Sequence, residues 1–242
     1  MNLVKVSVVA MVLCTGQLFA APGESQNTVT RYANAHAVAF KGAAQSSTAT
    51  QAAIPDNWKL VISEDGLRIQ KADGSDWYWL GDTAWGLFQE LNQEDADLYL
   101  STRAAQGFTV IQAVVVMGWN RGWNDDNAYG ERPFHNGNED TPNEAFWQHA
   151  DWLINKAEEH GLYVAILPAW GSFWTGKFSD NSAKRYATWI ANRYKDQENV
   201  IWVNGGDTRP SKNQTRWNVI GNALNETDPN HLITFHQSPQ ST

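Results

Sequence analysis

The sequence predicts an α/β fold with a parallel sheet, in which strands and helices alternate along the chain. Five runs are apolar almost throughout and rich in β-branched residues, which is typical of strands buried on both faces. Stretches of helical spacing separate these runs, at a repeat of roughly 40 residues that suits βα units. An open doubly wound sheet and a (β/α)8 barrel both fit this alternation. No glycine-rich phosphate loop follows the first strand, so the usual fingerprint of the doubly wound fold is missing.

The first 56 residues are expected to lie outside the folded domain, which would cover 57–242. Residues 1–20 have one lysine, an apolar run and small residues at their end, which is the pattern of a secretory signal peptide. A transmembrane anchor is the alternative, but the apolar run is shorter than the roughly 20 residues that a span needs. Residues 21–56 are rich in Ala, Ser, Thr, Gln and Asn and predict a flexible linker or tail. We therefore expect a secreted or periplasmic protein with no membrane contact once the leader is removed.

The elements of the domain follow from Trp58 onward. Two short alternating runs broken by Asp-Gly turns predict a β-ribbon that leads into a first strand at 77–81. An N-cap near Asn92 marks the start of the first helix, and glycine stops mark the ends of the first two. The predicted helices cover 92–107, 143–161, 181–196 and 213–228, and the further strands cover 108–116, 162–168, 199–206 and 231–236.

The composition of the chain excludes some classes of ligand and favours carbohydrates. The net charge of −8 argues against nucleic-acid binding. The one cysteine, Cys14, lies in the leader, and no Cys/His spacing of a metal site is visible, so neither metal nor cofactor is expected. Thirteen tryptophans are unusual, and flat aromatic side chains suit the apolar faces of sugar rings. The expected partner is an oligosaccharide or polysaccharide, with the oligomeric state left open.

Polar and aromatic residues gather at the carboxyl ends of the predicted strands, where barrel active sites lie. Asp207 is the strongest candidate, because the two glycines before it allow close backbone approach. Each of the others also has a structural interpretation, as a helix cap, a buried amide, a core aromatic or a structural histidine. The remaining candidates for substrate binding are Asp82, Thr83, Trp85, Gln112, Trp119, Asn120, Trp170 and His236.

Five segments of the chain together resemble the apiosidase-like catalytic domain of glycoside hydrolase family 140 and its relatives. The segments are "WYWLGDTAWGLF", "YLSTRAAQGFTVIQAVV", "NAYGERPF", "GLYVAILPAWG" and "VIWVNGGD". They occur in order between about Trp58 and His236 and so span nearly all of the predicted domain. The resemblance implies a (β/α)8 barrel exported by bacteria that degrade plant cell-wall pectin, and release of apiose-linked side chains as the activity.

The same resemblance assigns roles to individual residues. The family's aspartate in the "GGD" motif is the general acid/base, and it matches Asp207. The family's strand-one aspartate, expected to bind substrate hydroxyls, matches Asp82. The family's nucleophile is a glutamate on a later strand, and no such strand follows here. We therefore expect a barrel truncated after about five strands, inactive by itself.

Glycoside hydrolysis needs two carboxyl groups that flank the scissile bond, about 5 Å apart in retaining enzymes and about 6.5–9.5 Å apart in inverting ones. Asp207 is expected to supply one of them. The sequence leaves open the sugar, the linkage, and the choice between retention and inversion. A non-catalytic carbohydrate-binding protein or an inactive fragment is the alternative. An esterase is disfavoured, because the chain has no Gly-x-Ser-x-Gly motif.

Overall fold

The structure is a computed structural model that describes residues 54–117 and 124–238. The predicted signal peptide, most of the predicted tail, and two candidate site residues, Trp119 and Asn120, lie outside the described residues. Ile54 is already buried against the domain. The ordered packing therefore begins slightly before residue 57.

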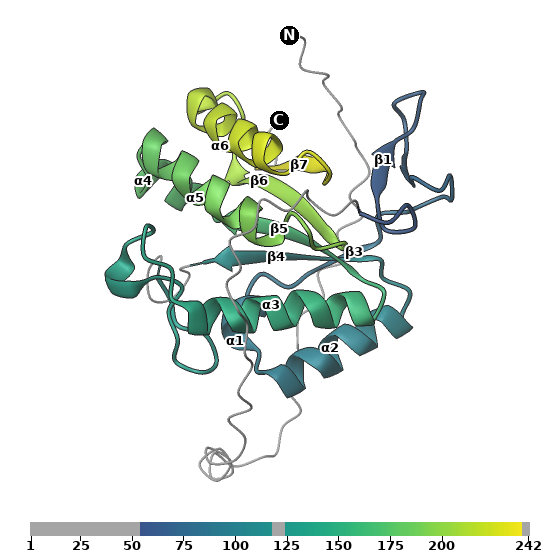
Figure 1. Cartoon of the computed structure of the whole chain (residues 1–242), viewed down its shortest axis with the longest axis horizontal. Helices are drawn as coiled ribbons and strands as arrows, with labels where there is room; N and C mark the ends of the chain where they lie inside the picture. Colours follow the sequence, from purple (N-terminus) through teal and green to yellow (C-terminus); the bar gives the residue numbers. More distant parts are fainter. Residues whose placement is uncertain (1–53, 118–123, 239–242) are drawn as a thin grey trace.

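A small ribbon and a larger parallel sheet make up the strands (Figure 1). The antiparallel ribbon consists of β1 (Leu60–Ile62) and β2 (Ile69–Lys71), as predicted. The sheet has the order β3-β4-β5-β6-β7, and every neighbouring pair is parallel. Its strands are β3 (Gly81–Thr83), β4 (Val110–Val116), β5 (Tyr163–Ala169), β6 (Val200–Thr208) and β7 (Ile233–Gln237). The strands curve into part of a barrel, which confirms the predicted fold class.

Helices connect the strands on one side of the sheet. The long ones are α2 (Gln93–Ala105), α3 (Glu144–Glu159), α5 (Asp180–Tyr194) and α6 (Gln214–Thr227). Side chains cap three of their N-termini, from Asn92, Asn143 and Ser179, and the cap at Asn92 was predicted from the sequence. Two short helices, α1 (Leu87–Glu90) and α4 (Gly171–Gly176), and the 3-10 turn His135–Gly137 were not predicted.

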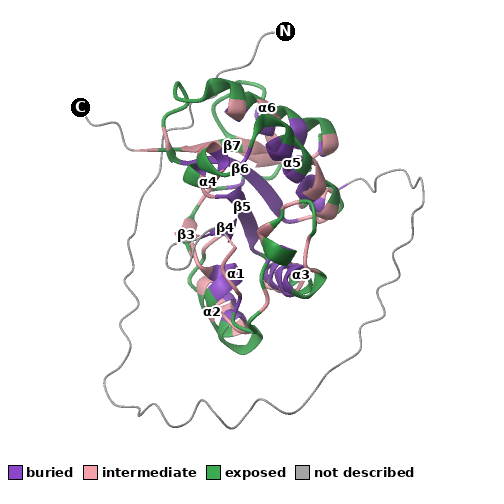
Figure 2. Cartoon of the chain, turned by 90° about the vertical axis from the view of Figure 1, so that its left-hand side faces the viewer, coloured by how far each residue is buried: buried purple, intermediate pink, exposed green. Residues whose placement is uncertain are grey.

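The sheet separates two layers of packing, and its central strands are buried on both faces (Figure 2). Ile111, Ala113 and Val115 belong to the core between the sheet and the helices. Val110 and Val114 belong to a second core on the inner, concave face. Strands covered on both faces are typical of parallel sheets, and this explains the nearly continuous apolar runs.

The ribbon and the segment before β3 close the inner face near the amino ends of the strands. The Tyr163 hydroxyl donates to the backbone oxygen of Trp58 at 2.7 Å, and the rings of Trp58 and Trp77 contact the Tyr163 ring. Because Trp77 is drawn into this inner core, the first strand begins at Gly81 and not at Trp77 as predicted. Gly81 pairs with Val110 there.

Within the described part of the chain, no helix combines the length and the apolar character that crossing a membrane would require.

Candidate active site

Strand β6 ends in an irregular backbone that sets the position of Asp207. Gly205, Gly206 and Asp207 all have positive φ angles, of 96°, 112° and 47°. The pairing with β7 shifts register between Gly205 and Thr208. Such irregularities re-aim side chains at the ends of strands. The two glycines therefore turn Asp207 out of the regular alternation of the strand.

Close contact with the start of α4 explains why Gly206 has no side chain. A Cβ atom on Gly206 would lie 2.5 Å from the backbone nitrogen of Gly171, and one on Gly171 would collide with the backbone oxygen of Gly206. The same Cβ on Gly206 would also touch the indole of Trp170. The ends of β5 and β6 are thus locked together, and this holds Trp170 beside the strand end that carries Asp207.

Three aromatic rings form a cluster next to Asp207, which we call the aromatic cup. It consists of Trp85, Trp170 and His236. The two indoles meet edge to face at 5.2 Å between centroids. The imidazole lies 5.4 Å from the ring of Trp85 and 5.7 Å from that of Trp170. Both indoles are half-buried and pack on the inner-face core. The cup therefore combines carbon-rich faces with a polar ring.

Asp207 is linked to the cup through His236. The backbone N–H of Asp207 donates to Nδ1 of His236 at 3.3 Å, and its carboxylate Oδ1 lies 3.7 Å from the same nitrogen. The Asp207 side chain is 57% exposed, whereas that of His236 is 13% exposed. A carboxylate that reaches solvent beside a half-buried aromatic surface is open to a ligand seated in the cup.

The hydrogen bond at Nδ1 and the burial of the ring determine the protonation state and the tautomer of His236. Burial lowers the pKa of His236, and the neighbouring Asp207 carboxylate opposes part of that shift. The imidazole is therefore neutral at pH 7. Because Nδ1 accepts a hydrogen bond, the proton of the neutral ring sits on Nε2. That nitrogen is a donor suited to a hydroxyl group.

Thr83 and Gln112 lie on the same inner face of the sheet. The two residues are register partners, and Gln112 pairs in turn with Ala165 of the inner core. Thr83 is exposed and Gln112 is buried. Nε2 of Gln112 has no hydrogen-bond partner among the described residues, although buried polar groups are usually paired. These side chains place two further polar groups on the concave face.

Asp82 lies on the opposite face of the sheet. It is the register partner of Ile111, whose side chain belongs to the helix-side core. Its carboxylate accepts a hydrogen bond from the Tyr99 hydroxyl at 2.9 Å and forms an ion pair with Nε of Arg103. Burial and the adjacent carboxylate raise the pKa of Tyr99, so the phenol remains a donor. This placement gives Asp82 a structural role and does not support the substrate-binding role that we predicted.

The arrangement brings most of the predicted site together. Asp207, His236, Trp170 and Trp85 form one connected group, Thr83 and Gln112 share its face, and Asp82 is separate. In the ranges 54–117 and 124–238, no three His, Cys, Asp or Glu side chains group in a way that would hold a metal ion. The structure adds Gly171 to the residues that shape the site. In the sequence, a glycine directly after Trp170 at the end of a strand indicates close backbone approach at that point.

An acid next to sugar-sized aromatic surfaces, at the carboxyl end of a parallel barrel sheet, suits acid/base chemistry on a carbohydrate. Comparisons with known proteins agree. The family model that describes the apiosidase-like catalytic domain matches residues 63–242. Among curated proteins, none matches.

Solved structures of glycoside hydrolases share the fold. A structure described as a glycoside hydrolase is 32% identical, with a TM-score of 0.68, and the match covers 78% of this chain and 43% of that one. A glycoside hydrolase family 5 protein from Bacteroides vulgatus is 30% identical, with a TM-score of 0.69, covering 78% and 41%. A family 5 mannosidase from Rhizomucor miehei, at 12% identity and a TM-score of 0.58 over 78% and 58%, is alike in fold alone.

The chain thus spans less than half the length of the first two of these structures. The family match nevertheless covers most of the chain, and it includes every described residue of the aromatic cup together with Asp207. It also confirms the resemblance that the five sequence segments indicated. The chain belongs to the family of apiosidase-like catalytic domains.

Proposed function

We propose that this chain supplies the general acid/base and the sugar-binding surface of a glycoside hydrolase that removes apiose-linked side chains from plant pectin. The observation that carries the proposal is the exposed carboxylate of Asp207 beside the aromatic cup at the end of β6. The family match supports the choice of substrate. Because pectin lies outside the bacterial cell, secretion or export to the periplasm is part of the proposal.

Each residue then has a chemical task. The indoles of Trp85 and Trp170 contact the apolar face of the sugar. His236 donates from Nε2 to a sugar hydroxyl. Asp207 gives its proton to the glycosidic oxygen as a second carboxylate bonds to the anomeric carbon and the alcohol leaves. Asp207 then takes a proton from the water that attacks the anomeric carbon, which releases the sugar and frees the second carboxylate. The proton returns to the carboxylate, so the cycle balances.

The second carboxyl group is proposed to come from a strand other than β3 to β7. Asp82 was the other strand-end acid in the predicted site, and it is bound to Arg103 on the helix-facing side. Without a nucleophile, the chain by itself would bind sugar and hold the acid in place, but it would not complete the reaction.

A small external anion tests this division of labour, because azide can replace a missing carboxylate nucleophile. We expect the 242-residue chain to turn over aryl apiosides only when azide is added. Asp207→Asn should lower azide-supported turnover of a substrate with a poor leaving group by about 10²–10⁴-fold, since such a leaving group needs protonation. A nitrophenyl leaving group should be affected much less. Asp196→Asn, an exposed acid at the other end of the sheet, serves as the matched control.

The outcomes separate the alternatives. Turnover without azide would mean that the chain has its own nucleophile and would refute the proposed division. If azide gives no turnover but the substrate still quenches tryptophan fluorescence, the chain is a carbohydrate-binding protein. Equal losses in the Asp207 and Asp196 variants would remove Asp207 from the acid role.

A further inference from the structure

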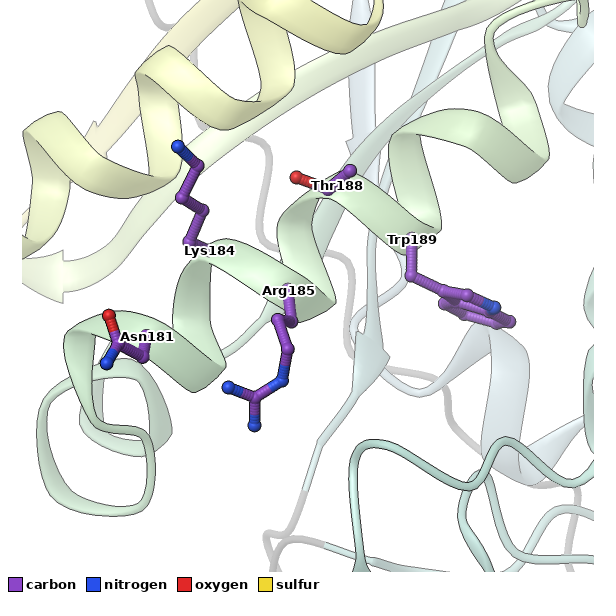
Figure 3. Close-up of a pocket in the computed structure, with 5 residues that line it drawn as sticks. All are labelled: Asn181, Lys184, Arg185, Thr188 and Trp189. Atoms are coloured by element: carbon purple, nitrogen blue, oxygen red, sulfur yellow. The ribbon is translucent and has the colours of Figure 1, made fainter.

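The outer wall of the barrel carries a hollow of about 470 Å³ on helix α5, away from the aromatic cup (Figure 3). Its lining is Asn181, Lys184, Arg185, Thr188 and Trp189. These positions follow the three- and four-residue spacing that places side chains on one helix face. The hollow is shallow and open to solvent, which suits a stretch of polymer better than an enclosed small molecule. The cup lies on the inner face of the sheet, whereas α5 packs on the outer face.

Trp189 provides a fixed aromatic surface in this hollow. Its indole meets that of Trp147 edge to face at 4.6 Å, and the guanidinium of Arg193 lies 5.8 Å from its ring centroid. Trp189 is half-buried, so part of the ring remains accessible. A ring held by its neighbours loses little conformational entropy when a ligand stacks on it.

The rest of the lining presents donors of two kinds, one exposed ammonium group and one guanidinium that is already paired. No carboxylate of the described residues lies within ion-pair distance of Lys184, which is exposed. Arg185 forms a two-pronged pair with Asp140 through Nε and Nη2, both at 2.8 Å. This pair fixes the guanidinium plane and leaves its Nη1 donors for a ligand. The lining residues include two cations and no acid, although Asp140 and the nearby Glu139 offset the charge of Arg185, so Lys184 is the cation without a paired carboxylate among the described residues.

The side chains are spread as an extended ligand would require. Figure 3 shows Lys184 extended toward α6 and Arg185 extended in the opposite direction, with Trp189 farther along the same helix. A single small anion would not meet both cations. A chain that carries a carboxylate at regular intervals, with a flat sugar face between them, would reach all three.

We propose that this face of α5 binds a segment of an acidic polysaccharide, with a uronate ring on Trp189 and neighbouring carboxylates on Lys184 and Arg185. The inference extends the proposed function by adding a second contact with the same polymer, outside the cup.

Affinity electrophoresis through gels that contain polygalacturonate tests the proposal on the full chain. We expect retention that weakens as salt is raised. Retention should disappear in gels of fully methyl-esterified polygalacturonate, which keeps the sugar rings and loses their charges. A neutral galactan should not retain the protein either.

Two variants probe the site, and a chemically similar pair on α3 controls for them. Lys184→Ala should weaken binding about threefold to fivefold, as expected for an exposed charge pair. Trp189→Ala should weaken it about fivefold. The controls are Lys156→Ala and Trp152→Ala, because the Lys156 ammonium lies 5.5 Å from the Trp152 ring but also pairs with Glu159. These controls should bind as the wild type does.

Circular dichroism checks the fold of each variant, and Lys184→Ala keeps the test valid if Trp189→Ala does not fold. Lys184→Ala should keep its azide-supported turnover while its retention weakens, so failure at this site is distinguishable from failure at the cup. Equal retention on the esterified polymer, equal weakening in the α3 controls, or equal binding to single-stranded DNA would overturn the proposal.

Discussion

Asp82 and Asp207 are two aspartates at the ends of strands in one sheet, yet they lie on opposite faces of it. The carboxylate of Asp82 is 13% exposed and pairs with Arg103, whereas that of Asp207 is 57% exposed and lies beside His236. Asp82 ties β3 to α2, and Asp207 faces the cup. The same residue type therefore serves packing in one place and is available for chemistry in the other.

Strand alternation accounts for the difference. Successive side chains of a strand point to opposite faces. Asp82 lies on the helix-facing side with its register partner Ile111, and Thr83 lies on the concave side with its register partner Gln112. At β6 the two glycines break the alternation, and Asp207 is directed by backbone geometry instead. Being at the carboxyl end of a barrel strand is thus insufficient evidence for a catalytic role.

The largest effect should come from removing Asp82, the acid that is mostly covered and paired. Asp82→Ala leaves the Arg103 guanidinium and the Tyr99 hydroxyl without their partner, and we expect it to lower the free energy of unfolding by about 3 kcal/mol. Asp207→Ala should change it by less than about 0.5 kcal/mol, because its side chain is mostly in solvent. Urea unfolding of both variants makes the comparison. Similar losses would show that the two acids do not differ in structural importance.

A smaller effect should follow from disturbing the backbone that directs Asp207. Gly206→Ala combines an unfavourable φ with a Cβ contact against Gly171, and it should cost about 2 kcal/mol. Gly176→Ala is the control, since a Cβ there meets nothing within 4 Å and alanine suits a helix. The unfolding midpoint in urea measures both. A neutral Gly206→Ala would mean that the strand end adapts freely, and that the glycines do not set the position of Asp207.

Much of the fold was predictable because periodicity reports burial directly. Helix α2 begins after the Asn92 cap, and β4 reads as an apolar run covered on both faces. The short helices α1 and α4 were not predicted, because four to six residues are too few for helical periodicity to be visible in the sequence. The start of β3 was misplaced because Trp77 does not belong to the strand. Its side chain packs in the inner-face core near the amino ends of the strands.

The site was predictable only to the level of the strand end. That Asp207, Trp170 and His236 gather follows from parallel strands ending at one edge. The face on which Asp82 lies did not follow, because β3 has only three residues and "GDT" shows no alternation of polar and apolar types. The sequence did contain a signal for the partners of Asp82. Tyr99 and Arg103 are four residues apart and so lie on one face of α2.

The smallest effect tests whether Asp207 and His236 interact as the geometry indicates. Burial holds the pKa of His236 below its ordinary value of 6.5, so the unfolded chain binds more protons than the folded one as pH falls below 6.5. The stability that neutral His236 contributes is therefore present above pH 6.5 and lost as pH falls through the pKa of the folded state. The Asp207 carboxylate opposes this shift, so Asp207→Asn should lower the pKa of His236 further. NMR titration of the His236 ring proton in both proteins measures this, and an unchanged pKa would show that the carboxylate and the imidazole do not interact.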